Sequence, residues 1–105
     1  MEIHHPSRLL PEDTKRRYLE FLHTKNMSAG VYRLPAGAED TQQPHNQEEI
    51  YYVISGRARF TAGQKNVAIL PGDTIFVPAG EIHRFRDIEE DLELLVLFAP
   101  PEGPE

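Results

Sequence analysis

Four side chains that could hold a metal ion lie in two short segments of the chain: Gln43, His45 and Glu49 in the first, and His83 in the second. Alternate side chains of an extended strand point to the same face, so the three residues of the first segment share one face. This spacing predicts that one strand aims an amide oxygen, an imidazole and a carboxylate into one volume. His83 follows a Pro-x-Gly turn at the start of another expected strand and could complete the set.

Nitrogen and oxygen ligands of this kind suit Fe(II), Mn, Ni, Cu(II) or Zn, and the chain has no cysteine that could supply a thiolate. Two histidines and one carboxylate with open positions are also the ligand type of non-haem iron oxygenases. Since an amide oxygen is a weaker, neutral ligand, a site completed by Gln43 is expected to be harder and to bind its ion less tightly. Each residue alone also fits a solvated surface position, so the joint spacing carries the hypothesis.

Short strands are the elements that must position these residues. The strongest is expected at residues 49–55, EIYYVIS, whose apolar residues occupy both faces, so both faces should be covered. Gly- and Pro-containing turns, and an acidic turn at 87–91, separate seven to nine short strands, which is typical of an all-β sandwich or barrel. The other expected strands are 18–22 (which also fits a helix), 27–34, 57–61, 67–70, 74–77, 82–86 and 92–98.

The length of 105 residues indicates a single domain. We expect an irregular N-terminal lead-in at residues 1–17, a β-barrel at 18–99 and a Pro-rich tail at 100–105. A barrel this small hides more apolar surface when it pairs, so a homodimer is expected.

Composition excludes some partners. Seventeen acidic residues against eleven basic ones give a net charge of −6, which argues against nucleic acid or an anionic membrane surface as the main partner. No apolar stretch approaches the roughly 20 residues that span a bilayer, and the N-terminus lacks the pattern of a signal peptide. A cytoplasmic location is therefore expected.

Residues 37–56, GAEDTQQPHNQEEIYYVISG, resemble the first motif of the cupin superfamily, G-x5-H-x-H-x3-E-x6-G. His45 matches the second histidine of the motif and Glu49 matches the glutamate. Gln43 stands where the first histidine is usual.

Residues 72–87, GDTIFVPAGEIHRFRD, resemble the second cupin motif, G-x5-P-x-G-x2-H-x3-N. Pro78, Gly80 and His83 match it, while Asp87 stands where asparagine is usual. The two motifs in this order are much more specific than either motif alone.

The resemblance covers residues 27–99 and implies a cupin double-stranded β-helix, a jelly-roll barrel with a metal ion near one mouth. The residues that would hold the ion are His45, Glu49 and His83, with Gln43 as the fourth. Tyr51 shares the face of Glu49 and could orient a substrate in the barrel.

Two functional hypotheses follow from the resemblance. The first is a small metal-dependent enzyme acting on a small polar molecule, with a dioxygenase-type reaction favoured over isomerisation. The second is a non-catalytic module that binds or senses a small ligand, with or without metal. The three matching ligands favour catalysis, whereas Gln43 favours binding. A storage role is disfavoured, because one barrel lacks the two-barrel length of storage-type relatives.

Overall fold

The structure is a computed structural model that describes residues 1–11 and 17–101. A single 3-10 turn, η1 (Pro6–Arg8), lies in the expected irregular lead-in. The described residues then form six strands, which are β1 (Tyr18–His23), β2 (Ser28–Leu34), β3 (Glu48–Ala62), β4 (Lys65–Ile69), β5 (Thr74–Val77) and β6 (His83–Ala99). The expected all-β fold class is confirmed. Residues 12–16 of the lead-in and 102–105 of the tail lie outside the described residues, and the domain boundaries stay a prediction.

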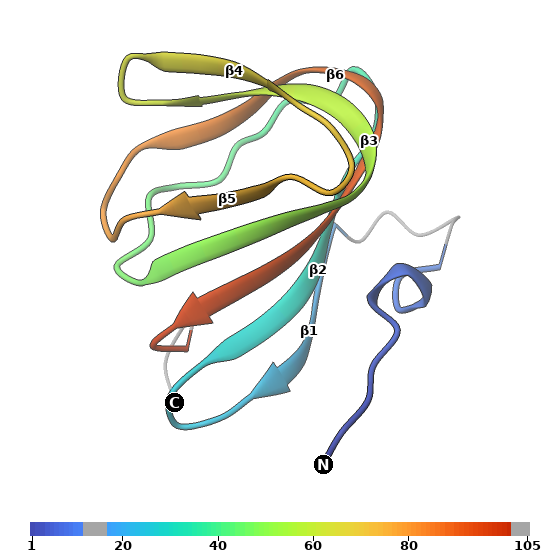
Figure 1. The fold of residues 1–105 in the computed structure, drawn as a ribbon, viewed down its shortest axis with the longest axis vertical. Coiled ribbons are helices and arrows are strands. Elements are labelled where there is room, and N and C mark those ends of the chain that lie inside the picture. Colours follow the sequence, from blue (N-terminus) through green and yellow to red (C-terminus); the bar gives the residue numbers. More distant parts are fainter. Residues whose placement is uncertain (12–16, 102–105) are drawn as a thin grey trace.

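Strands β3 and β6 form one long antiparallel ribbon, which runs from the pair Glu48–Ala99 to the pair Ala62–His83. Figure 1 shows both strands running to one side of the molecule, turning over together and running back. Three register shifts mark the bend, and Gly56 lies among them with a φ of 97°. The ribbon therefore folds over on itself and builds both layers of the barrel.

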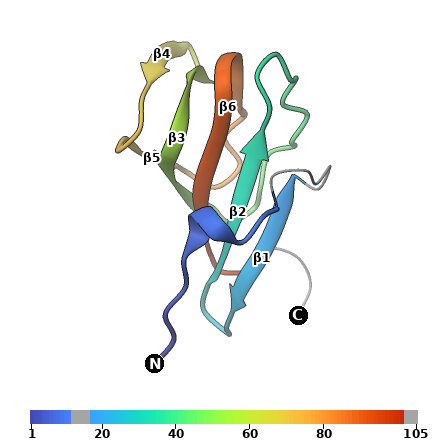
Figure 2. The same ribbon diagram turned by 90° about the vertical axis from the view of Figure 1, so that its right-hand side faces the viewer.

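The remaining strands extend the two layers of the folded ribbon. The first half of β3 pairs with β5 on one side and with the second half of β6 on the other, and β6 continues to β2 and β1. The second half of β3 pairs with β4 and with the first half of β6. In the view of Figure 2, strands β1, β2, β6 and β3 lie side by side in this order.

The core fills the space between the layers with residues that alternate along the ribbon with outward-facing polar ones. Tyr51, Phe60 and Phe85 form an aromatic group in which ring centroids lie 4.8 to 6.1 Å apart. Aliphatic side chains of β2 and β6 surround this group, including Leu34, Leu92, Leu94 and Val96. The core therefore includes Tyr51 in the first half of β3, two residues after Glu49.

Two of the predicted turns are absent from the described residues, so these two predictions are wrong. Ser55–Gly56 lies within β3, and residues 87–91 lie within β6, so the expected seven to nine strands become six. The first is a bend, because Gly56 changes the direction of a strand without ending it. The second continues as a strand because Ile88 is buried in the core while its acidic neighbours point to solvent. Segment 18–22, which also fitted a helix, is the strand β1.

The outer face of β3 is not covered by any described part of the chain. Tyr51 and Val53 are buried as expected, but Ile50 and Tyr52 are 38% and 42% exposed. Phe76, the neighbour of Ile50 on β5, is 56% exposed. We call Ile50, Tyr52 and Phe76 the outer apolar patch.

Candidate metal centre

Three of the predicted ligands converge at one end of the barrel: His45, Glu49 and His83. Their ligand atoms all lie within 4.8 Å of one another, so the three side chains share one small volume. Glu49 is near the start of β3 and His83 begins β6, so they stand at opposite ends of the ribbon. Glu49 Oε1 nevertheless lies 3.1 Å from His83 Nε2, because the bend at Gly56 brings the two ends together.

Glu49 is a buried carboxylate that has no hydrogen-bond donor among the described residues while His83 Nε2, 3.1 Å away, is unprotonated. Its side chain is 2% exposed, and neither carboxylate oxygen accepts a hydrogen bond of acceptable geometry. A buried charge in this condition is costly unless an opposite charge compensates it. A divalent cation would supply that charge, so the residues present fit a metal ion.

The protonation of His83 also fits a ligand role. Its Nδ1 lies 2.9 Å from the carbonyl oxygen of Glu81, which can only accept, so Nδ1 carries the proton. In the neutral ring the lone pair of Nε2 then faces Glu49 and the hydroxyl of Tyr51, 3.0 Å away. A histidine that binds a metal commonly donates its other ring N–H to a carbonyl in this way.

A proton on Nε2 is the alternative partner of Glu49. Burial lowers the pKa of His83, but the hydrogen bonds with Glu49 and with the Glu81 carbonyl, together with the charge of Glu49, raise it above its ordinary value overall. The proton and a metal ion would therefore compete for the same space between the two side chains.

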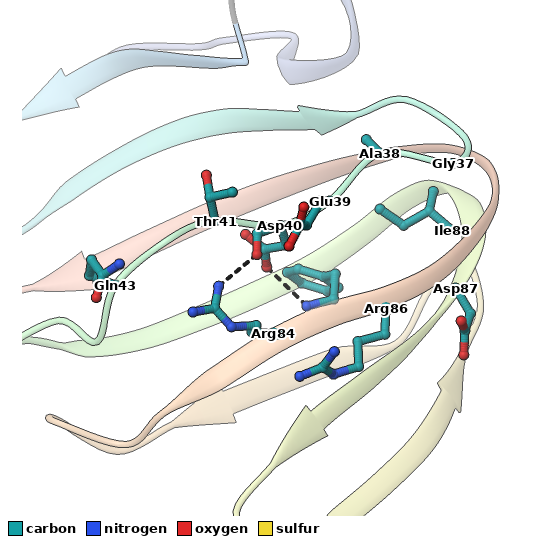
Figure 3. A pocket seen from close by; sticks show the side chains of 11 residues that line it. Gly37, Ala38, Glu39, Asp40, Thr41, Gln43, Arg84, Arg86, Asp87 and Ile88 are labelled. Carbon is teal, nitrogen blue, oxygen red and sulfur yellow. Dashed lines mark hydrogen bonds between the residues drawn. The ribbon is translucent and has the colours of Figure 1, made fainter.

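Gln43 is not brought together with the three residues above. Its side chain is exposed and lines a surface hollow of about 690 Å³ on the outside of the barrel, drawn in Figure 3. The amide beside the site belongs instead to Gln42, whose Oε1 lies 3.5 Å from His45 Nε2. Residues 35–47 form a loop rather than a strand, so side-chain alternation does not apply to them, and a ligand role for Gln43 stays a prediction. Nothing else in the sequence around Gln42 and Gln43 indicates which of the two amides lies beside the site.

A cavity of about 160 Å³ opens beside His45 and Glu49. Its remaining walls are Tyr18, Tyr32, Gln42, Tyr51, Val96 and Phe98. The Tyr51 hydroxyl donates to Gln42 Oε1 at 3.0 Å. Burial first, and then the charge of Glu49, raise the pKa of Tyr51 far above its ordinary value, so the hydroxyl keeps its proton. Tyr51 thus lines the cavity, and its role toward a substrate stays a prediction.

Comparison with known proteins agrees with this architecture. The cupin domain family matches residues 30–98, which are more than half of the chain. The chain therefore belongs to the cupin family, and the folded-over ribbon is the double-stranded β-helix of that family. The resemblance that the two motifs predicted is confirmed.

Similar proteins include one of uncharacterised function from Streptomyces coelicolor, 51% identical over 82% of each chain. An oxalate-binding protein from Thermotoga maritima is 34% identical over 75% of this chain and 67% of its own. The crystal structure of TT1209 from Thermus thermophilus superposes with a TM-score of 0.80 at 26% identity, covering 96% of this chain and 99% of that one. None of the helices described for this chain is long and apolar enough to cross a membrane.

Proposed function

We propose that this cupin binds one divalent metal ion through His45, Glu49 and His83 and takes up a small carboxylate at the positions that remain open. The observation that carries the proposal is the buried Glu49 carboxylate, whose Oε1 lies 3.1 Å from His83 Nε2 and which has no donor among the described residues while that nitrogen is unprotonated. When bound, an ion of Fe, Mn, Ni, Cu or Zn would supply a Lewis acid for ligand oxygens.

The size and charge of the site support a small anionic ligand. The cavity of about 160 Å³ is far larger than the roughly 10–15 Å³ that one water needs, and smaller than the ~300 Å³ at which drug-sized pockets begin. Two neutral histidines and one carboxylate leave a divalent centre with net positive charge, which attracts an anion. The similarity to an oxalate-binding protein supports the same class of ligand.

In the catalytic form of the proposal the chain is a metal-dependent enzyme of dioxygenase type rather than an isomerase. Glu49 is then a ligand and not a base. Tyr51, which keeps its proton at the inner wall of the cavity, would orient the substrate. A non-catalytic binding module is the second candidate, and the similarity to a protein named for binding oxalate favours it.

Elemental analysis of the protein, purified without an affinity tag, tests the metal site directly. We expect close to one equivalent of a transition metal in the native chain and almost none in His45→Ala, because one of the ligands is lost. His23→Ala is the matched control, since His23 is an exposed histidine of β1 whose Nδ1 lies 2.9 Å from Glu20 Oε1, away from the three predicted ligands. A native chain that stays empty after incubation with each of the five metals would contradict the proposal.

Metal-loaded protein can then separate the two candidates. Calorimetric titration with oxalate measures binding, and oxygen uptake in the presence of small carboxylates measures catalysis. Binding without turnover of any carboxylate would favour the module, whereas oxygen consumption that His45→Ala abolishes would favour the enzyme.

We also propose that two copies of the chain pair through the outer apolar patch. Beside the patch lies a groove of about 250 Å³ with mostly apolar walls, which include Met27 of the loop before β2 and Leu97 of β6. An apolar surface of this kind, formed where the sequence predicts covered strand faces, is typical of an interface.

Phe76→Lys is expected to convert a dimer into a monomer, because it places a charge in the centre of the proposed interface. Light scattering after size exclusion should show the mass falling from twice 12.0 kDa to 12.0 kDa. Val67→Lys, at an exposed apolar residue of β4 outside the patch, should leave the mass unchanged. A native chain that is monomeric at all concentrations would exclude the interface.

A further inference from the structure

We infer that Gln42, held in place by Asp40, supplies a fourth side-chain ligand to the metal centre, and that Asp40 acts as its positioning residue. The inference rests on the proposed function, because it concerns the same site. It assigns to Gln42 and Asp40 roles that the sequence pattern did not indicate.

Asp40 is a buried carboxylate fixed by several donors. Its Oδ2 accepts from the backbone N–H of Phe85 at 2.9 Å, and its Oδ1 accepts from the hydroxyl of Tyr32 at 3.2 Å. The carbonyl oxygen of Asp40 accepts from Arg84 Nη1 at 2.6 Å. Figure 3 shows Asp40 beside Arg84 of strand β6, with the contact between these two residues drawn as a dashed line. The loop is therefore fastened to β6 at this residue.

This anchor decides which way the Gln42 amide points. Gln42 donates to Asp40 twice, from its backbone N–H at 3.2 Å and from its side-chain Nε2 at 2.8 Å. An ionised carboxylate only accepts, so the NH₂ end of the amide must face Asp40 and the oxygen must face the opposite way. The hydroxyl of Tyr51, which donates to Gln42 Oε1 at 3.0 Å, agrees with this orientation. The amide oxygen thus points into the cavity that His45 and Glu49 line.

The distances suit ligands of a common ion. Two ligand atoms about 2.1 Å from one ion and in adjacent positions are roughly 3 to 3.5 Å apart. Gln42 Oε1 lies 3.5 Å from His45 Nε2, and Glu49 Oε1 lies 3.1 Å from His83 Nε2. The exposed amide of Gln43 lines a different hollow.

A centre completed by Gln42 would have two imidazole nitrogens, one carboxylate oxygen and one amide oxygen. The amide oxygen is a harder donor than a third imidazole, and oxygen donors suit Mn(II) whereas imidazole suits Cu and Zn. Gln42 would therefore shift the selectivity of the site toward Mn(II), at some cost in affinity for Cu(II) and Zn(II).

The test compares Gln42→Leu with the adjacent control Gln43→Leu by titration with Mn(II), followed by electron paramagnetic resonance. We expect the Mn(II) affinity to fall roughly 10–100-fold in Gln42→Leu, and to stay within about twofold in Gln43→Leu. Gln42→His should reverse the selectivity, so that Zn(II) gains affinity relative to Mn(II). Circular dichroism and the melting temperature establish that each variant is folded.

Asp40→Asn tests the positioning role, because an amide in this place can no longer hold the orientation of Gln42. It should weaken Mn(II) binding in the native background and have little further effect in the Gln42→Leu background. An equal loss in both backgrounds would mean that Asp40 only supports the fold.

Three outcomes decide the inference. A loss in Gln42→Leu that Gln43→Leu does not share supports it. Equal Mn(II) affinity of Gln42→Leu and the native chain, while His45→Ala fails to bind, would overturn the role of Gln42 and leave the proposed metal site standing. A native chain that binds no metal would overturn both.

Discussion

Replacing Glu49 by glutamine is expected to abolish metal binding and, in the same variant, to stabilise the metal-free protein. Binding should weaken by at least ~100-fold, because the only charged ligand of the centre is lost. Without metal, the free energy of unfolding at about pH 9 should rise by roughly 1–3 kcal/mol. The reason is that at this pH His83 is neutral, so a buried carboxylate without a donor is replaced by a neutral amide that can donate to His83 Nε2.

The stabilisation should depend on pH with a definite sign. The pKa of His83 is raised in the folded protein, so the stabilising pair of protonated His83 with Glu49 is present at low pH and is lost as the pH rises through that raised pKa. The gain from Glu49→Gln is therefore largest at about pH 9 and should shrink or reverse below about pH 6.5, the ordinary pKa of histidine.

Urea unfolding in the presence of a chelator measures this effect. Glu48→Gln is the control, because Glu48 is exposed at the neighbouring position of β3. Its stability should change by less than about 0.5 kcal/mol. If Glu49→Gln is less stable than the native chain at alkaline pH, then Glu49 has a compensating partner in the metal-free protein and the metal proposal loses its main support.

Substituting Gly56 by alanine is expected to lower the free energy of unfolding strongly. Gly56 has a φ of 97°, and a Cβ there would overlap the carbonyl oxygen of Asp91 and lie 2.7 Å from the Cα of Leu92. Backbone atoms of the paired strand cannot move aside cheaply. We expect a loss of about 3–5 kcal/mol, which combines the left-handed conformation with this overlap.

Gly72→Ala separates the two contributions. Gly72 has a nearly identical φ of 95°, but a Cβ would meet nothing within 4 Å. Its cost should therefore be about 1–2 kcal/mol. Urea unfolding of both variants gives the difference, and equal losses would mean that the bend at Gly56 accommodates a side chain. Folded Gly56→Ala should also bind metal more weakly, since the bend sets the distance between Glu49 and His83.

Much of this fold could be predicted because its signals are local. Turn residues and apolar stretches located the strands, and the two motifs predicted the barrel and the convergence of His45, Glu49 and His83. The turns at Ser55–Gly56 and 87–91 were misplaced because a bent strand and a turn use the same residue types. Only pairing along the whole ribbon distinguishes them.

The amide at the site could not be assigned from sequence for a different reason. Alternation applies to extended strands, and residues 35–47 are held instead by contacts with β6, which lies more than forty positions further along the chain. Nothing near Gln42 and Gln43 encodes those contacts. The two-sided apolar pattern of 49–55 likewise did not reveal that one face of the single chain is exposed.

The folded ribbon has a consequence for the order in which the protein assembles. Glu49 and His83 lie at its two ends, so they meet only after the strands have paired and the bend has closed. We therefore expect the ligand set to be still incomplete in the transition state for folding. An ion bound by these residues would lower the unfolding rate much more than it would raise the folding rate. Its main effect would be a longer lifetime of the folded barrel.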